Sequence, residues 1–519
     1  MKSKKLLGIT LAYALVFSTI SCSKDKLLDI NNTPNSPTSV TMPVLFTGTL
    51  AATGFMATND LGRTGSLLIQ HSAGIANQPA AYDVYILRGS FDNQWNGELY
   101  GGALVNSQLL IDLAVTQSSP AYSGVAKLIK AYNFSVVTDL YGDVPYSQAL
   151  QGIANAHPRY DKQEDIYKGN TSLGIQGLIA LVQDGLADLD RTSATKPGLG
   201  DDLAYGKTTN NIAQWKKMGN TLLLKFANTI SKKEPALAAT LINQAATGAF
   251  TSNADDFEIP FGTATGNLNP LYNYNFVTRP DDQMLSQTLL NAMASRNDPR
   301  LPIYFNTTQP VTGTVNTTGT TTSVGTFTGY INGNTAPVPA RVPVAANPAL
   351  TNRSRYNTYI RGASGEAPAR LLTNFQRLFI LAESVLTLPG ITATGAATAQ
   401  SLYQDAIRAS MTKAGITDAA VTAYLSANPS VAILSTNQAQ ALSQIITQKW
   451  IAWVGNGIEP YNDYRRTTYP TLAPALNASG DDNTLPQRFP YPLSELTANA
   501  GAENQNVNLR TSAKVWWAN

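Results

Sequence analysis

The chain has 519 residues, of which 43% are hydrophobic and 14% are charged. This composition allows a large buried core, either in one large domain or in two to three domains of ordinary size. The formal net charge of +3 includes Lys2, Lys4 and Lys5, which belong to a leader that we expect to be cleaved. The remaining chain is near neutral, and this excludes the basic surface with which proteins bind nucleic acid.

Residues 1–21 have the pattern of a lipoprotein signal peptide. Lysines precede the apolar run LLGITLAYALVFSTI, which is too short to cross a membrane, and Ser21 precedes Cys22, the single cysteine of the chain. We expect Cys22 to carry acyl chains that anchor the protein to a membrane. The alternative is an ordinary signal peptide in which Cys22 is incidental. With one cysteine, no intrachain disulfide can form.

After the leader, residues 22–45 are polar and contain Pro34 and Pro37, which predicts an extended tether that then lies along the body. Residues 46–255 are predicted to form an array of helices, because large apolar residues repeat at intervals of three and four. The first predicted helix covers residues 88–115. Its apolar stripe consists of Phe91, Trp95, Leu99, Leu104 and Leu109.

Further helices of this array are predicted over residues 125–141, 171–190 and 211–230. We expect Trp95 and Trp215 to lie in the core, with a role as ligand platforms as the less favoured alternative.

The stretch from Thr138 to Tyr167 connects two of these helices. Gly142 is predicted to end the first, since glycine takes a left-handed cap conformation at little cost, and Pro145 prevents the helix from resuming. Asp161 is the predicted N-cap of the next helix. We interpret the stretch as a packed helix–loop–helix corner, with a ligand site as the alternative.

The helical pattern breaks between residues 256 and 367, which we interpret as a loop-rich insert. Its Thr- and Gly-rich run, residues 307–339, favours short strands and turns. The string GNLNPLYNYN places aromatic rings beside amides. Rings offer flat apolar faces to sugar C–H groups, while amides supply directional hydrogen bonds. The predicted ligand-binding residues of the insert are Tyr272, Tyr274, Phe276 and Arg279, and turn packing is the alternative.

Residues 368–519 are predicted to form a C-terminal helical part and a tail. Residues 371–388 and 399–415 form a predicted helical hairpin, whose second helix matches a tetratricopeptide pattern, and a last helix covers residues 441–457.

Glu383 lies on the apolar stripe of the first helix of this hairpin, and a buried carboxylate needs a partner. We predict a structural ion pair, rather than a catalytic one, between Glu383 and Arg465 or Arg466.

The sequence offers little for catalysis. His71 and His157 are far apart and lack zinc-type spacing, and Cys22 is expected to be acylated. No phosphate-binding glycine motif and no nucleophile elbow occurs. We therefore expect no enzymatic activity, no cofactor and no metal site. A glycosidase needs only two carboxylates, so a glycan-cleaving enzyme on a helical scaffold remains an alternative.

Several strings of the sequence occur in an order that resembles the SusD/RagB family of nutrient-uptake lipoproteins. The likeness is strongest to its SusD-like branch, described as starch-binding and associated with the outer membrane. The strings include DLYGDVPYSQA, WKK at Trp215, DPRLPIYF, AES at 382–384 and RRTTYP. The resemblance implies a mainly α, SusD-like fold with tetratricopeptide-like helix pairs, a loop-rich insert and small β elements, in a single domain over residues 22–519.

The resemblance also implies a lipid-anchored protein on the exterior of the outer membrane. Such a protein binds a glycan or oligosaccharide and delivers it to a SusC-like, TonB-dependent transporter barrel; a peptide ligand is the alternative within the same fold. Similar proteins build their sites from an early loop together with the insert, so Tyr82, Tyr85 and Arg88 are a second set of predicted ligand-binding residues. Asn374 and Gln376 stand near a position where relatives often carry an acidic residue.

Overall fold

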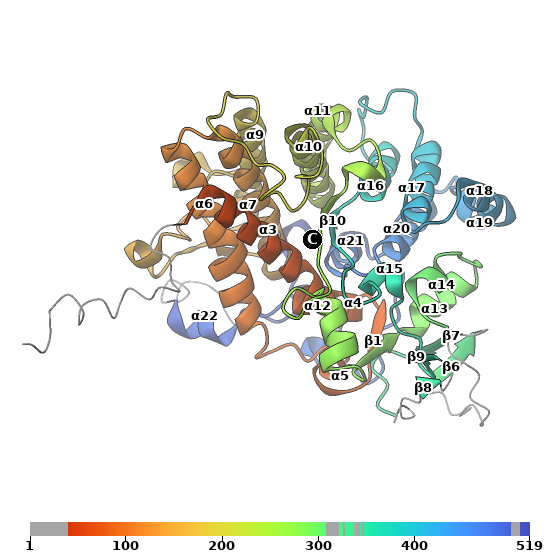
Figure 1. Cartoon of the computed structure of the whole chain (residues 1–519). Helices are drawn as coiled ribbons and strands as arrows, with labels where there is room; N and C mark the ends of the chain where they lie inside the picture. The colour runs from red at the N-terminus through yellow and green to blue at the C-terminus, as the bar shows by residue number, and fades with distance from the viewer. Residues whose placement is uncertain are drawn as a thin grey trace, which may run out of the picture.

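The computed structural model describes residues 40–307, 321–324, 327–336, 338, 343–344, 347–499 and 509–518. Over these ranges the chain is mainly helical, with small sheets between the helices (Figure 1). This confirms the predicted fold class. Cys22 and most of the predicted tether lie outside the described residues, so lipidation stays a prediction. No helix in the described ranges is both long enough and apolar enough to cross a membrane.

The helical framework is built from neighbouring helices that pack in pairs, as the tetratricopeptide-like pattern predicts. Helix α6 packs on α7, α7 on α9, α10 on α11 and α16 on α17. The longer helices are α3 (Met42–Thr58), α4 (Asp60–Leu68), α6 (Val105–Thr116), α7 (Pro120–Tyr141), α9 (Leu178–Asp188), α10 (Asn211–Ile230), α11 (Pro235–Ala245), α16 (Asn374–Thr387), α17 (Ala399–Lys413), α18 (Asp418–Ala427), α20 (Gln438–Ala452) and α21 (Ile458–Thr467).

Shorter helices sit in the connections and in the insert. They are α5 (Asn77–Asp83), α8 (Gln163–Lys168), α12 (Pro270–Tyr272), α13 (Gln287–Ala294), α14 (Leu301–Tyr304), α15 (Thr358–Arg361), α19 (Pro429–Ala432) and α22 (Leu493–Ala498). Figure 1 shows α3, α6, α7 and α9 gathered on one side of the molecule and α13 to α20 on the other, with α10 and α21 between them.

Antiparallel strand pairs tie distant parts of the chain together. In the described residues the pairs are β1 (Ser72–Gly74) with β5 (Gln283–Leu285), β2 (Val144–Pro145) with β3 (Tyr160–Asp161), β4 (Phe257–Ile259) with β10 (Ala369–Leu372), β6 (Thr321–Val324) with β7 (Phe327–Tyr330), and β8 (Pro343–Val344) with β9 (Asn347–Thr351). Strands β4 and β10 bracket the insert, so it leaves and re-enters the helical body at one place. Strands β6 and β7 confirm short strands in the Thr- and Gly-rich run.

The two tryptophans predicted for the core are buried there, with Trp95 2% and Trp215 0% exposed. The Trp215 ring lies 5.9 Å from that of Phe46 on α3 and 5.4 Å from that of Phe257 on β4. One buried aromatic cluster therefore joins the helical array to the base of the insert. Aromatic pairs at such distances add to the stability that burial alone provides.

The predicted helix over residues 88–115 is divided in the structure. It begins as a π-helix, η2 (Gln94–Leu104), and continues as α6. The wide π turns bring Leu99 and Leu104, five residues apart, onto the same buried face. The prediction that Leu109 continues this stripe is wrong, because Leu109 is 49% exposed. It follows Leu104 by five residues, about 140° around an α-helix, whereas the buried face of α6 consists of Ser107, Leu110 and Ala114.

The corner between α7 and α8 confirms one predicted boundary and corrects another. Helix α7 ends before Gly142, which takes a φ of 84°. The predicted cap at Asp161 is wrong, because Asp161 lies in β3, where its carboxylate accepts a hydrogen bond from the backbone N–H of Ser147 at 2.6 Å. Helix α8 begins at Gln163, whose N–H donates to Asp143 at 2.8 Å. Strand pairing with β2 thus takes Asp161 away from the helix.

Candidate ligand-binding site

The aromatic segment of the insert forms a tight turn of helix. Asn269 caps it, since its side chain accepts from the Leu271 N–H at 2.9 Å and donates to the Ala367 carbonyl at 2.8 Å. Helix α12 then widens into the π turn η7 (Asn273–Thr278). This geometry stacks the Tyr272 and Phe276 rings, whose centroids lie 5.6 Å apart with planes 12° from parallel. Both rings are partly exposed.

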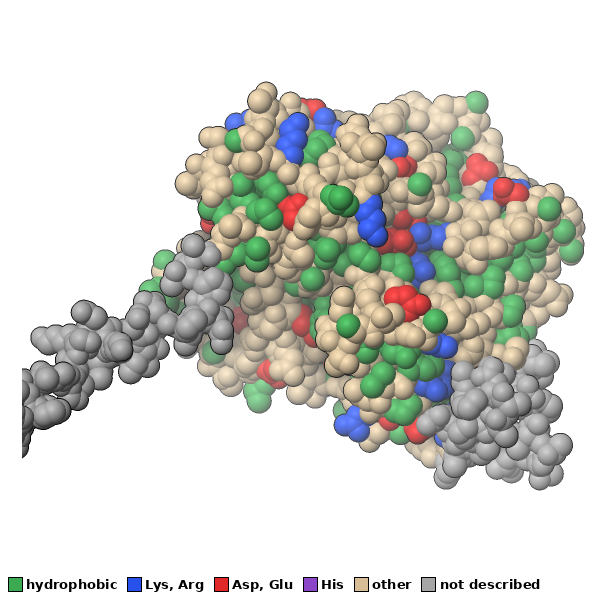
Figure 2. All heavy atoms as spheres, in the orientation of Figure 1, with side chains coloured by type: hydrophobic (Ala, Val, Ile, Leu, Met, Phe, Trp, Pro, Cys, Tyr) green, Lys and Arg blue, Asp and Glu red, His purple; other side chains and the backbone are tan. Residues whose placement is uncertain are grey.

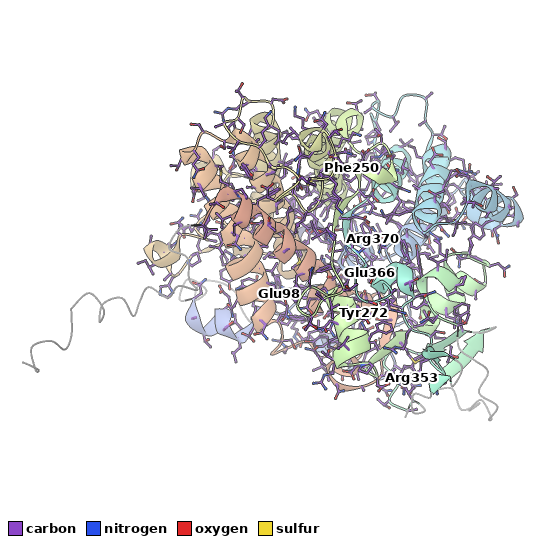
Figure 3. All side chains as sticks on the ribbon, in the orientation of Figure 1. Glu98, Phe250, Tyr272, Arg353, Glu366 and Arg370 are labelled. Carbon is purple, nitrogen blue, oxygen red and sulfur yellow. The ribbon has the colours of Figure 1, made fainter. Side chains whose placement is uncertain are left out.

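Two arginines extend this stack. The guanidinium carbon of Arg355 lies 4.1 Å and that of Arg361 4.6 Å from the Phe276 centroid. Burial lowers the pKa of Arg361, whose guanidinium donates to the Gly362 carbonyl at 2.8 Å. Among the described residues no group hydrogen-bonds the Tyr272 hydroxyl, which stays available to a ligand. Figure 3 shows Tyr272 close to Glu366 on the front of the molecule.

The other two predicted insert residues do not join the stack. The Tyr274 hydroxyl donates to Asp282 at 3.1 Å, and its ring lies 3.3 Å from the guanidinium carbon of Arg63, so Tyr274 belongs to the packing beneath the turn. Arg279 follows η7 and is exposed.

The early loop lies against the insert, as expected, because β1 pairs with β5. Its two tyrosines are nevertheless buried, Tyr82 at 3% and Tyr85 at 2% exposure. The hydroxyl of Tyr85 accepts from the Ala475 N–H at 2.8 Å. Arg88 is half-exposed and pairs with Asp481 at 2.8 Å. The tyrosines thus present no ring face to solvent and are not available to stack on a ligand.

The structure also reveals a cavity that the sequence did not predict as a unit. Its volume is about 260 Å³, and its walls come from η2, the loop of the α7–α8 corner and α22. It combines apolar and amide groups of the type that bind neutral polar ligands. The lining residues that carry such groups are Tyr100, Asn96, Leu150, Asn155 and Asn499. Its one carboxylate, Glu495, accepts from Tyr160 at 2.9 Å and from the Trp95 ring N–H at 3.2 Å.

The predicted ion pair is present, with Arg466 as the partner. Both terminal guanidinium nitrogens of Arg466 donate to the Glu383 carboxylate, one of them at 2.8 Å. Burial alone would raise the pKa of Glu383, but the neighbouring guanidinium outweighs it and holds that pKa below its usual value. Arg465, the other predicted partner, does not contact Glu383: it donates to the backbone carbonyls of Asp139 and Gln487.

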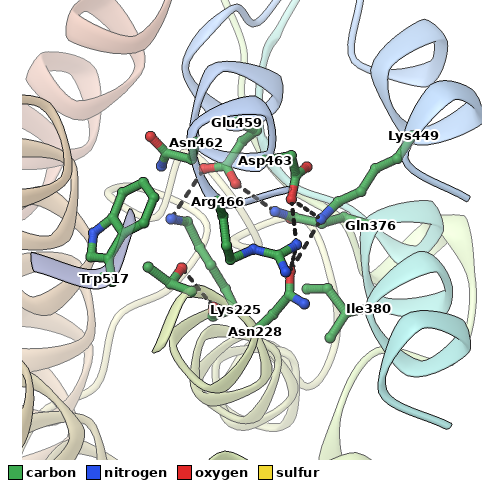
Figure 4. A pocket seen from close by; sticks show the side chains of 11 residues that line it. Lys225, Asn228, Gln376, Ile380, Lys449, Glu459, Asn462, Asp463, Arg466 and Trp517 are labelled. Carbon is green, nitrogen blue, oxygen red and sulfur yellow. Dashed lines mark hydrogen bonds and ion pairs between the residues drawn. The ribbon is translucent and has the colours of Figure 1, made fainter. Parts of the chain in front are cut away.

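This pair lies in a buried cluster of charged groups where α10, α16, α20 and α21 meet (Figure 4). Lys449 donates to Asp463 at 2.9 Å, and Lys225 lies 3.4 Å from Glu459. Gln376, near the position where the resemblance predicts an acidic residue, donates to Glu459 at 2.6 Å. The carboxylate at this place therefore belongs to Glu459 on α21. The space inside the cluster is about 10 Å³, room for no more than a water, and its role is to join helices.

The described residues give little support to catalysis. The cavity at the α7–α8 corner has one carboxylate, Glu495, among its lining residues, and a cavity of about 340 Å³ beside α21 has none, whereas a glycosidase places two across its cleft. His71 is fully buried; burial lowers its pKa to about 3, and its ring bonds the Trp450 carbonyl at 2.9 Å. Within the described ranges no group of His, Cys, Asp and Glu side chains could hold a metal ion.

The sequence of residues 34–492 matches the SusD-like family described as starch-binding and associating with the outer membrane. Because the match covers most of the chain, the protein belongs to this family. No curated protein sequence matches the chain.

Solved structures of the same fold agree with the family. A chitin-binding protein is 22% identical over 92% of this chain and 100% of its own, with a TM-score of 0.72. A chitin-binding SusD homologue from Flavobacterium johnsoniae is 21% identical over 92% of this chain and 98% of its own, also with a TM-score of 0.72. A SusD homologue from Bacteroides fragilis is 23% identical over 92% and 100%, with a TM-score of 0.71. At this identity the likeness shows the fold, which is SusD-like.

Proposed function

We propose that this protein binds a glycan at the cell exterior, as a lipid-anchored protein of the outer membrane, and passes the ligand to a TonB-dependent transporter. The observation that carries the proposal is the family match over residues 34–492. Two similar structures, matched over nearly their whole length, are those of chitin-binding proteins. Most of the surface visible in Figure 2 consists of neutral polar side chains and backbone, with scattered charged side chains. Such a surface of low charge fits recognition through hydrogen bonds and ring stacking.

The ligand site that we propose is the stack of Tyr272 and Phe276. The rings are held by a capped turn and by two arginines, so little side-chain freedom is lost when a sugar packs on them. Tyr272 and Asn273 are both partly exposed, so the hydroxyl and the amide can bond sugar hydroxyls at this rim of the turn. Arg279, exposed at the end of η7, is the cationic residue nearest in sequence to this rim.

Titration calorimetry with chitin and starch oligosaccharides tests the proposal. We expect the wild type to bind one of these series, and Tyr272→Ala to weaken that binding by about tenfold or more, the loss of one stacking contact. Phe55→Ala is the matched control, because Phe55 is 41% exposed on α3, on another element. Wild-type affinity in Tyr272→Ala would move the site elsewhere, and Asn155→Ala would then test the cavity at the α7–α8 corner.

Titration with peptides and an assay for released reducing ends decide among the other classes of function. Binding of peptides without binding of either glycan series would replace the glycan by a peptide. Release of reducing ends from the oligosaccharides, followed over hours, would make the protein an enzyme.

The transporter enters the proposal because a lipid-anchored protein cannot itself move a solute across the outer membrane, where spanning structures must satisfy every backbone hydrogen bond internally.

A further inference from the structure

A second, larger cavity lies where α21 meets the C-terminal segment. Its volume is about 340 Å³, within the range of small-molecule sites. Residues from α21 and the loop after it form one wall, and residues 483–487 and 514–518 form the other. Lys232, just after α10, completes the lining. None of these elements contributes to the Tyr272–Phe276 stack.

The lining of this cavity carries positive charge without negative charge. It includes Lys232, Arg465 and Lys514, and none of its lining residues is an Asp or Glu. Both lysines are exposed, and among the described residues neither makes an ion pair. The carboxylates that are near in sequence are used elsewhere: Glu234 pairs with Lys168 at 2.6 Å.

The acidic residues of the neighbouring loop are also engaged. Asp481 pairs with Arg88 at 2.8 Å and accepts from the Thr511 N–H at 2.7 Å. Asp482 pairs with Arg510. Among the described residues, therefore, neither Asp481 nor Asp482 is free to neutralise the cationic side chains of the cavity.

Arg465 is the buried member of this cationic set. It is 2% exposed, and its hydrogen bonds go to the backbone carbonyl of Asp139 at 2.6 Å, to that of Gln487 at 3.0 Å and to the side chain of Asn462. No carboxylate lies within ion-pair distance of it in the described residues, and its Nε is buried without a hydrogen-bond partner. Its neighbour Arg466, in contrast, is fully paired.

The remainder of the lining is apolar or neutral. The Tyr464 ring and the side chains of Leu472 and Leu485 offer an apolar surface, while Asn483 and Gln487 offer amides. Such a combination suits a compact ligand with one anionic group and a body that packs on a ring.

We propose that this cavity binds a small organic anion, with a carboxylate directed to Lys232, Lys514 and Arg465 and a ring-shaped body against Tyr464. Arg465 contributes its positive charge and its Nε–H, which has no hydrogen-bond partner among the described residues, because its terminal nitrogens already donate to Asp139, Gln487 and Asn462. The ligand has two possible sources: a free acid, or an acidic sugar at the end of a longer chain. The proposal goes beyond neutral-glycan binding and does not depend on it.

Glucuronate and glucose are the probes, because they share a ring and differ in charge. In calorimetry at low salt we expect the wild type to bind glucuronate at least tenfold more tightly than glucose. The double variant Lys232→Gln/Lys514→Gln should lose about tenfold or more of that affinity. Both lysines are exposed, so the variant should fold, and an unchanged melting temperature verifies this. Raising the salt concentration should weaken binding in the wild type.

Lys233→Gln is the matched control, since Lys233 is the exposed neighbour of Lys232 and does not line the cavity. It should bind glucuronate like the wild type. Tyr272→Ala should also leave this binding unchanged, which separates the cavity from the proposed glycan site. Equal affinity for glucuronate and glucose, or wild-type affinity in the double variant, would overturn the proposal.

A third probe, an oligosaccharide that ends in glucuronate, distinguishes the sources. Binding at least as tight as that of the free acid would assign the site to the end of an acidic glycan. Binding of the free acid alone would assign it to a small organic acid, because the longer chain would then not fit the 340 Å³ space.

Discussion

Arg465 and Arg466 are adjacent in the sequence but have different surroundings. One turn of α21 directs Arg466 to the Glu383 carboxylate and Arg465 to backbone carbonyls beside a cavity. A helix rotates by about 100° per residue, so neighbours face different parts of the structure. The role of each arginine therefore depends on the direction in which its side chain leaves α21 and on the groups that lie within its reach.

Removal of the Glu383 charge should destabilise the protein strongly. Glu383→Gln leaves the buried Arg466 guanidinium with Asp463 as its remaining carboxylate partner beside the neutral Asn228, and breaking a buried pair costs about 3–5 kcal/mol. Urea unfolding measures the loss. The control is Lys216→Gln, which breaks the more exposed pair with Asp190 and should change little. An unchanged unfolding midpoint in Glu383→Gln would contradict the burial of this pair.

Asp255 should contribute to stability in a pH-dependent way. Burial alone would raise its pKa, but Lys217 and the backbone N–H groups of Thr251 and Ser252 outweigh it and lower the pKa to about 2. Because the pKa is lower in the folded than in the unfolded state, the contribution is complete above the unfolded value near 4 and is lost as the pH falls towards 2. The stability difference between wild type and Asp255→Asn should therefore be larger at pH 7 than at pH 2.5. A difference that is independent of pH would contradict this assignment.

At the scale of elements, two glycines have opposite effects on their helices. Gly142 ends α7 with a φ of 84°, where a side chain is strained and its Cβ would lie 3.3 Å from the Arg488 guanidinium. Gly48 lies inside α3, where a Cβ would meet no atom within 4 Å. Gly142→Ala should thus destabilise the protein by about 1–2 kcal/mol. Gly48→Ala should stabilise it by about 0.5–1 kcal/mol, because alanine favours helix.

Thermal unfolding of the two variants measures both signs in one experiment. If Gly142→Ala melted like the wild type, the backbone at the end of α7 would not require glycine. If Gly48→Ala melted lower, its position would be packed against other residues.

At the scale of the whole molecule, the first prediction concerns the anchor. Cys22→Ala should move the protein from the membrane fraction to the soluble fraction, because the acyl chains that we expect on this thiol would be missing. Ser21→Ala is the control, since it changes the neighbouring residue and keeps the thiol. Fractionation of cells that express each variant gives the result, and retention of Cys22→Ala in membranes would contradict lipid anchoring at this residue.

The second prediction at this scale concerns the transporter. Mild-detergent purification of the tagged, lipidated protein from its native cells should recover a TonB-dependent barrel with it. The protein that carries Cys22→Ala should recover less of the barrel, since the anchor keeps the two together at the membrane. Recovery of the wild-type protein alone, under conditions that preserve other outer-membrane complexes, would favour a free-standing surface binder.

The amino-acid sequence by itself determined the features that depend on neighbouring residues. The spacing of apolar side chains predicted a helix over residues 211–230, and α10 has those bounds. Gly142 predicted the end of α7, and the position of Glu383 on an apolar stripe predicted a buried carboxylate that needs an arginine. Helix periodicity and caps act within about one turn, so they can be recognised without knowledge of the rest of the chain.

Only the tertiary structure decided the features that depend on distant segments. Pairing with β2 places Asp161 in β3 and not at a helix cap. The rings of Tyr82 and Tyr85 are buried. Arg466, and not Arg465, points to Glu383 because the two side chains leave α21 in different directions. Both large cavities join residues that are far apart in sequence. The physical reason is that burial and charge pairing are set by what packs against a residue. In these cases the partner lies 14 positions away for Asp161, 83 for Arg466 and 390 for Tyr85, beyond the reach of helix periodicity and caps.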